Sequence, residues 1–181
     1  MNKPIYLLFW SVLIMVCFTS CVKDTDFDQA DDIVLSPVLE LDFIYFTLDQ
    51  SDYFNPNTGE QRLIVTDTTD FEILNESFVR DDLKRAEYLF KLENSAPISF
   101  LTEFRFLNEN DEVVYEVAIP ISAGSIAAPV LTEHIENIEN QGILELTLAS
   151  KVVVNVIIPS SFENIEGALN LQSKTTYFFE I

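Results

Sequence analysis

The sequence predicts an all-β protein and, within that class, an antiparallel two-sheet β-sandwich. Apolar and polar residues alternate with period two in several segments, and these segments are rich in β-branched and aromatic side chains. Short polar turns rich in Asn and Asp separate them. About seven to nine such strands suit two packed sheets. An immunoglobulin-like arrangement is the first expectation, and a jelly roll or small barrel is the alternative.

The first expected strand, residues 38–48, begins by alternating and becomes apolar on both faces, which predicts a central strand. A turn at residues 55–59 leads to a short strand at 62–65. The segments that alternate most clearly, or are most apolar, are residues 84–93, 98–107, 113–119, 151–158 and 175–181.

Two points of the strand pattern carry more specific expectations. Tyr45, Tyr88 and Tyr115 stand at strand positions that predict core-facing or sheet-internal rings. Residues 137–149 are ambiguous, because alternating leucines favour a strand while one short helix fits equally well.

The first 20 residues predict an export signal. Lys3 is their only charged residue, and the apolar core from Ile5 to Phe18 is 14 residues long. A membrane-spanning helix needs roughly 20 apolar residues, whereas the apolar region of a secretory signal takes about 7–15. The length therefore favours a cleaved signal at residues 1–20 over a short uncleaved membrane helix.

The end of this segment, Phe18-Thr19-Ser20-Cys21, resembles a bacterial lipobox. The resemblance implies cleavage between Ser20 and Cys21 and attachment of diacylglycerol to the Cys21 thiol. Cys17 is a poorer candidate, because Val16 is branched where the lipobox has a small residue. The mature chain would then hold no free thiol, and the fold would depend on its apolar core.

The acidic residues after Cys21 favour a solvated tether over residues 21–36. Lys23 followed by Asp24, Asp26 and Asp28 also resembles the export signal of bacteroidete-type surface lipoproteins. That resemblance implies an outer-membrane protein displayed on the cell surface, with a periplasm-facing or inner-membrane location as alternatives. The segment 93–117 further resembles part of an uncharacterised β-sandwich found in exported lipoproteins of the same bacteria, and this resemblance implies no activity.

The globular domain is expected at residues 37–181. Loss of Lys3 with the signal changes the formal charge from −20 to −21. Nucleic acids and anionic lipids are bound through basic surfaces, so this balance argues against both as direct partners.

The sequence contains no nucleophile elbow, Walker loop or dinucleotide fingerprint, and we predict no catalytic or metal-binding residue. His134 lies among acids at Glu133 and Glu136, where an ordinary surface histidine is the simplest interpretation. The acids after Cys21 lack the glycine and the glutamate of an EF-hand loop, and no cofactor is predicted. Calcium bridging loop carboxylates is a weaker hypothesis, which involves Asp49, Asp52, Asp67 or Asp70.

Tyr53 and Phe54 flank a turn and are the weak candidates for ligand contact, although they would equally close the end of the core. The expected function is that of a non-enzymatic, lipid-anchored envelope protein. Its acidic β-sandwich would serve as a structural or binding module for an envelope protein or a polysaccharide. The alternatives are an accessory subunit of an outer-membrane export, assembly or uptake complex, and a carboxylate-based hydrolase.

Overall fold

The computed structural model describes residues 34–158, 161–162 and 166–181. Leu35–Ile181 forms one compact unit. Its described part contains eight strands: β1 (Val38–Leu48), β2 (Ile64–Asp70), β3 (Leu83–Asn94), β4 (Phe100–Leu107), β5 (Val113–Ile121), β6 (Val130–Glu139), β7 (Lys151–Ile157) and β8 (Leu169–Phe179). Four short helical segments connect some of them: η2 (Gln50–Tyr53), η3 (Glu72–Asn75), α2 (Ser77–Asp82) and α3 (Gln141–Leu146).

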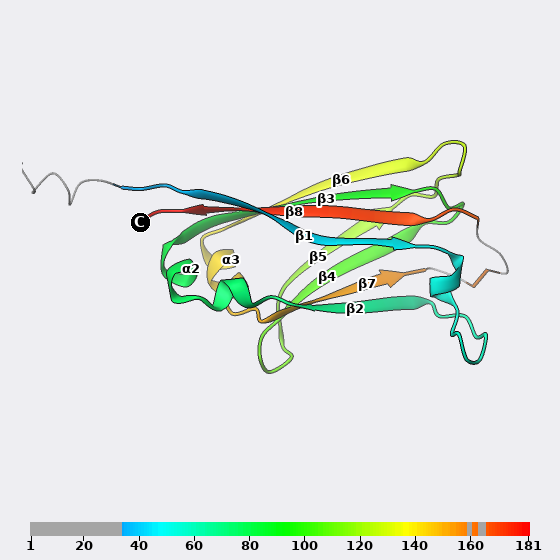
Figure 1. Ribbon diagram of the computed structural model, residues 1–181, viewed down its shortest axis with the longest axis horizontal. Helices are drawn as coiled ribbons and strands as arrows, with labels where there is room; N and C mark the ends of the chain where they lie inside the picture. Colours follow the sequence, from blue (N-terminus) through cyan, green and yellow to red (C-terminus); the bar gives the residue numbers. More distant parts are fainter. Residues whose placement is uncertain (1–33, 159–160, 163–165) are drawn as a thin grey trace, which may run out of the picture. The chain divides into compact units, whose positions relative to one another are not determined.

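The strands form two antiparallel sheets of four strands, which lie as two layers (Figure 1). The order is β1-β8-β3-β6 in the first sheet and β2-β7-β4-β5 in the second sheet. Buried apolar side chains from both sheets fill the space between the layers. The predicted all-β, two-sheet sandwich is therefore confirmed.

The strand order is that of a jelly roll. The ladders β1–β8, β2–β7, β3–β6 and β4–β5 are nested within one another along the chain, and the ladders β3–β8 and β4–β7 join them into sheets. In an immunoglobulin domain the first two strands pair within one sheet, whereas here β1 and β2 lie in opposite sheets. The immunoglobulin-like expectation is wrong and the jelly-roll alternative is right, because alternation reveals which residues face the core but not which strands pair.

The segments with clear alternation became strands at the expected places. β3 alternates almost perfectly between buried and accessible positions. β8 lies between β1 and β3, as expected for a strand inside a sheet, and it begins six residues before the predicted start at residue 175.

Two expectations need correction, one strand was not predicted, and one open alternative is resolved. β1 is an edge strand instead of a central one. β2 extends to Asp70 because an edge strand tolerates the polar sequence IVTDTTD, with most of its side chains in solvent. β6 was not predicted, because Leu131 and Ile135 lie on its exposed face while its inner face is mostly polar, so the sequence lacks the apolar alternation that marks a strand. Residues 137–149 contain the end of β6 and then α3, so the helical alternative holds for Gln141–Leu146.

Aromatic rings dominate the core. The ring of Phe43 packs against Tyr88 with the ring centroids 5.0 Å apart, and against Phe71 at 5.5 Å. Phe90 and Phe104 bring the two sheets together, with their centroids 4.3 Å apart. Full burial of one such side chain contributes roughly 1.5–3 kcal/mol, so these contacts can hold the sandwich without disulfides.

Asn94 organises one end of the sandwich, where the β3–β4 loop approaches the β5–β6 loop. The side chain of Asn94 is fully buried, and its Nδ2 donates to the carbonyl of Ile98 at 2.7 Å and to that of Ser122 at 2.9 Å. Its Oδ1 accepts from the amide of Ala96 at 2.8 Å. One amide group therefore satisfies main-chain groups in two loops.

Candidate functional site

The most distinctive local feature of the first sheet is a β-bulge in β1. Asp42 pairs with Lys174 and Tyr45 pairs with Gln172, so Phe43 and Ile44 together face the single residue Ser173. The Ser173 hydroxyl donates to the Ile44 carbonyl at 2.6 Å and accepts from the Ile44 amide at 2.9 Å. The side chain of Ser173 thus replaces the ladder bonds that the extra residue removes.

The bulge reverses the direction of the Tyr45 side chain. In a regular strand Phe43 and Tyr45 would share a face. With one extra residue, Phe43 packs in the core while Tyr45 points outward with 78% of its surface exposed. The expectation that Tyr45 faces the core is wrong for this reason. Tyr88 is fully buried, as expected, and Tyr115 is half-buried at the edge between the sheets.

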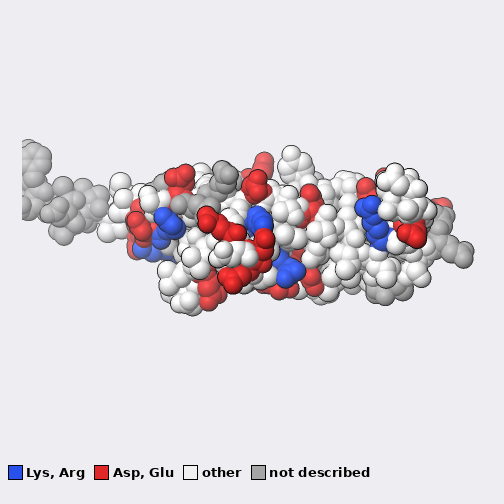
Figure 2. Space-filling view, turned by 90° about the horizontal axis from the view of Figure 1, so that it is seen from below, with Lys and Arg blue, Asp and Glu red and all other residues white. Residues whose placement is uncertain are grey.

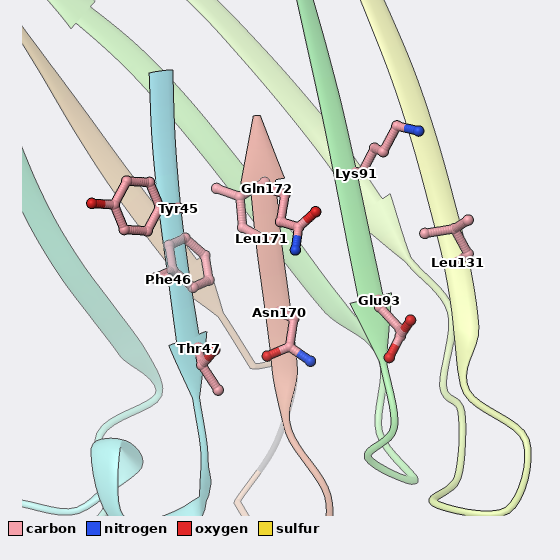
Figure 3. A pocket seen from close by; sticks show the side chains of 9 residues that line it. All are labelled: Tyr45, Phe46, Thr47, Lys91, Glu93, Leu131, Asn170, Leu171 and Gln172. Carbon is pink, nitrogen blue, oxygen red and sulfur yellow. The ribbon is translucent and has the colours of Figure 1, made fainter. Parts of the chain in front are cut away.

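A groove of about 350 Å³ lies on the outer face of the first sheet, beside the bulge (Figure 3). All four strands of the sheet contribute to this first-sheet groove. Its lining residues are Tyr45, Phe46, Thr47, Lys91, Glu93, Leu131, Asn170, Leu171 and Gln172. A volume of this size lies at the lower end of the range of about 300–1,000 Å³ that is usual for ligand pockets.

Strand register places the groove residues in rows across the sheet. Tyr45 pairs with Gln172, Gln172 with Lys91, and Lys91 with Glu133, so these four side chains cross all four strands. The neighbouring row is formed by Thr47, Asn170, Glu93 and Leu131. Figure 3 shows Asn170, Gln172, Lys91 and Glu93 rising side by side from β8 and β3, with Tyr45 at the β1 rim.

A second hollow of about 420 Å³ continues the groove along the strands. It shares Lys91 and Gln172 with the first hollow and extends to Asp42, Ser173 and Lys174. The two hollows thus lie on either side of the row that contains Tyr45 and Gln172.

Several polar side chains of the groove have no side-chain partner within the part of the chain that the structure describes. Asn170 and Gln172 make no side-chain hydrogen bond to any residue that the structure describes. Lys91 is paired with Glu133, with 2.9 Å between Nζ and Oε1, whereas Glu93 has no ion pair within the same described set. The groove therefore offers free amides and a free carboxylate.

Tyr53 and Phe54, the ligand contacts suggested by the sequence, close the end of the core. Tyr53 is only 1% exposed, and its ring stacks on Phe100 with the centroids 5.9 Å apart. The half-buried ring of Phe54 meets Phe162 edge-on at 6.0 Å. Neither ring is part of the first-sheet groove.

The acidic histidine segment does not form one cluster. Glu133 lies on the outer face of β6, while His134 and Glu136 lie on the inner side, because successive strand residues alternate. The Glu136 carboxylate accepts from the Tyr115 hydroxyl at 2.6 Å, and its other oxygen lies 3.0 Å from His134 Nε2. This bridge joins β5 of the second sheet to β6 of the first, where the sandwich is open.

Burial and the adjacent Glu136 carboxylate raise the pKa of Tyr115 above its ordinary value, because both disfavour a phenolate. The neutral phenol therefore remains the hydrogen-bond donor throughout the physiological range.

The carboxylates proposed for calcium binding have other roles at η2. Asp49 accepts from the Ser51 amide at 2.7 Å, and Asp52 accepts from the Asp49 amide at 2.9 Å, so the two form a capping box. Asp67 is exposed on β2, where its carboxylate accepts from the amide of Thr68. Residues 34–158, 161–162 and 166–181 contain no group of three or more His, Cys, Asp or Glu placed to hold a metal ion.

The residues predicted for lipidation and export lie outside the described residues, namely Ser20, Cys21, Lys23, Asp24, Asp26 and Asp28. No helix in the described part of the chain combines the length and the apolar character needed to cross a membrane. Acidic side chains are spread over the face shown in Figure 2, where basic side chains occur at only a few points.

The groove residues were not found from the sequence. The one available signal was the loss of alternation within residues 42–46, where apolar residues follow one another. A buried strand and a bulge both produce this pattern, and only the pairing with Ser173 distinguishes them. Asn170 and Gln172 lie in the part of β8 that precedes the predicted strand.

Neither a family model nor a curated protein sequence matches the chain. Among solved structures, a candidate secreted protein from Parabacteroides distasonis matches with a TM-score of 0.43 at 15% identity, over 63% of this chain and 37% of that one. The VP2 subviral particle of infectious bursal disease virus matches with a TM-score of 0.43 at 8% identity, over 79% of this chain and 32% of that one. The chain thus spans only about a third of the length of these structures. Similarity at this level says nothing about function.

Proposed function

We propose that the chain is a non-enzymatic lipoprotein of a bacterial outer membrane, anchored through Cys21, and that its acidic jelly roll serves as a binding module on the cell surface. The observation that carries the proposal is the position of Cys21. It directly follows the apolar segment and a pair of small residues, and it precedes by 14 residues the start of the compact unit at Leu35. Two or three acyl chains on one cysteine would give durable attachment, which a single chain does not.

The binding role is supported by the first-sheet groove. An exposed tyrosine gathers there with two amides and a carboxylate that have no side-chain partner among the described residues. Polar side chains that converge in a hollow without internal partners are available for a ligand.

Intact-mass analysis of the natural protein tests the anchor. We expect a chain that begins at Cys21 and carries acyl groups, and we expect Cys21→Ala to remain unprocessed or to leave the membrane fraction. Protease treatment of intact cells then tests surface display, and complete protection of the domain would contradict it. A free thiol at Cys21 would overturn the whole proposal.

An accessory subunit of an envelope complex is the second candidate. Leu131 and Ile135 are 57% and 54% exposed on the outer face of the edge strand β6, where a partner protein would cover them. This candidate predicts stable co-purification with a large membrane protein after mild detergent extraction. A monodisperse protein without a partner would argue against it.

A further inference from the structure

We infer that the first-sheet groove binds a neutral polysaccharide, with a sugar ring stacked on Tyr45 and its hydroxyl groups bonded to Gln172, Asn170 and Glu93. The inference rests on the proposed function and names the ligand class of the proposed binding module.

The first argument is the position of Tyr45. A large aromatic side chain that stays 78% exposed contributes little hydrophobic free energy to folding. In this protein the β-bulge turns the side chain of Tyr45 outward. The bulge itself is held by two hydrogen bonds from Ser173, so the outward direction is built into the ladder. An aromatic face presents a flat apolar surface with a polar hydroxyl at its end, which matches the C–H faces and hydroxyl groups of a sugar ring.

The second argument is the chemistry of the two amides. Each of Asn170 and Gln172 offers an N–H₂ donor and a carbonyl acceptor. Both side chains stand on β8 in the rows of Thr47 and Tyr45. A sugar hydroxyl is also both a donor and an acceptor, so amides can satisfy a run of hydroxyl groups in either direction. The free Glu93 carboxylate accepts further hydroxyl protons and strengthens such bonds.

Charge decides between a neutral and an anionic ligand. Lys91 is neutralised by Glu133 and Lys174 approaches Glu40 at 3.4 Å, which leaves the carboxylates of Glu93 and Asp42 without an ion pair inside the described region. The groove is therefore net negative, within a chain of formal charge −20. Sulfated, phosphorylated or uronic-acid polymers would meet repulsion there, whereas a neutral polyol would not.

The shape favours a polymer over a single small molecule. The two hollows share Lys91 and Gln172 and together follow the strands from Thr47 to Asp42. On β8 the corresponding stretch from Asn170 to Lys174 spans four residue steps, or about 13 Å at roughly 3.3 Å per step. A shallow open groove of this length suits successive units of a chain.

The test uses the full-length natural lipoprotein in detergent micelles and measures binding by affinity electrophoresis and calorimetry. The probes are neutral capsular polysaccharide extracted from the producing cells, three neutral external glycans (starch, mannan and arabinoxylan), and heparin as an anionic control. Binding to the capsular polymer or to an external glycan identifies the source of the ligand, and either result with no heparin binding supports the inference.

Matched variants identify the site. Tyr45→Ala should weaken binding at least tenfold, whereas Tyr45→Phe, which retains the ring, should stay within about threefold of wild type. Gln172→Ala should weaken binding about fivefold. Leu144→Ala, at an exposed position on α3, should have no effect, and the thermal midpoints of the Tyr45 variants should equal that of the wild type.

Three outcomes would overturn the inference: no binding to any neutral probe, stronger binding to heparin, or equal binding by Tyr45→Ala and wild type. If Cys21 is lipidated and a protein partner is lost with Tyr45→Ala while no neutral glycan binds, the proposed binding module stands and only the saccharide ligand is wrong. If Cys21 is unmodified, the proposed function fails independently of the glycan result.

Discussion

The side chain of Asn94 donates a hydrogen bond of 2.9 Å to the main-chain carbonyl of Ser122, across 28 residues of sequence. The same amide also holds Ile98 and Ala96, so one buried residue fixes the β3–β4 loop against the end of β5. Residues 94–97 read Asn-Ser-Ala-Pro, and these contacts give the physical reason for the asparagine.

Asn94→Ala should lower the free energy of unfolding by about 3 kcal/mol, because it leaves buried carbonyl and amide groups without partners. Asn94→Asp should lower the free energy of unfolding by at least as much, since it places a carboxylate oxygen against the carbonyl oxygens of Ile98 and Ser122. Urea unfolding followed by far-ultraviolet circular dichroism measures both. Asn110→Ala, at an exposed turn, is the control and should change stability by less than about 0.5 kcal/mol.

Two glycines pack against the same loop and permit a graded test. A Cβ on Gly124 would lie 2.0 Å from the Asn94 carbonyl oxygen, and one on Gly167 would lie 2.3 Å from that of Ser95. Gly167 also has a φ of +99°, which disfavours any L side chain. Gly59 has a φ of +71° but open space around its Cβ position.

We therefore expect Gly59→Ala to cost about 1 kcal/mol, from backbone strain alone. Gly124→Ala should cost more, about 2–3 kcal/mol, because main chain must move. Gly167→Ala combines both effects and should be the most destabilising of the three. Equal losses at Gly59 and Gly124 in urea unfolding would mean that the close approach to Asn94 has little energetic weight.

Buried tyrosines should make the domain sensitive to alkaline pH. Burial is the main cause that raises the pKa of Tyr53, Tyr88, Tyr115 and Tyr177 above the ordinary value of about 10. A raised folded-state pKa means that the folded form holds protons that the unfolded form has lost. The stabilisation is complete below pH 10 and is lost as the pH rises toward the folded-state values.

The free energy of unfolding should consequently fall above about pH 10, by up to about 1.4 kcal/mol per pH unit for each such tyrosine. The absorbance of tyrosinate from the buried rings should appear together with unfolding, whereas exposed rings ionise without it. Tyr177→Phe should make the pH dependence less steep while leaving the core ring in place. An unchanged slope in this variant would contradict the assignment.

The bridge between Tyr115 and Glu136 should contribute modestly to holding the edges of the two sheets together. A double-mutant cycle with Tyr115→Phe and Glu136→Gln should give a coupling energy of about 1 kcal/mol, since the pair is partly exposed to solvent. The corresponding cycle for Lys91→Ala and Glu133→Gln, an exposed pair on the outer face, is the comparison and should give no more than about 0.5 kcal/mol. A smaller coupling for Tyr115 than for Lys91 would be inconsistent with the proposed role.

The sequence predicted strands wherever burial differs sharply between the two faces, as in β3 and β4. It failed for β6 and for most of β2, which are two of the edge strands. Six of the seven residues of β2 are exposed, and β6 carries apolar side chains on its exposed face, so both lack the apolar pattern that marks a strand. The order of the strands could not be predicted from the sequence either. Alternation is a property of each segment, whereas the jelly-roll order depends on contacts between distant segments such as Ile44 and Ser173, which are 129 residues apart.

The groove could not be predicted for a related reason. Its residues come from four strands, and each looks ordinary within its own strand. Tyr45 was assigned to the core because regular alternation was assumed through Phe43, and a single extra residue changes that assignment. Tyr53 and Phe54 stood out in the sequence through their proximity to a turn, yet the rings are needed to cover the end of the core.

The nested ladders have a consequence for the order of events in folding. β8 lies between β1 and β3, so the first sheet has a gap through its middle until residues 169–179 join it. A nascent chain that has emerged only as far as β7 can assemble the second sheet, whose members all lie between residues 64 and 157. The first sheet is thus completed only when β8 has been synthesised. A chain truncated before residue 169 would leave β1 without a strand to pair with. Closure over so long a loop is entropically costly and slow, so the first sheet is completed only after the second sheet can form.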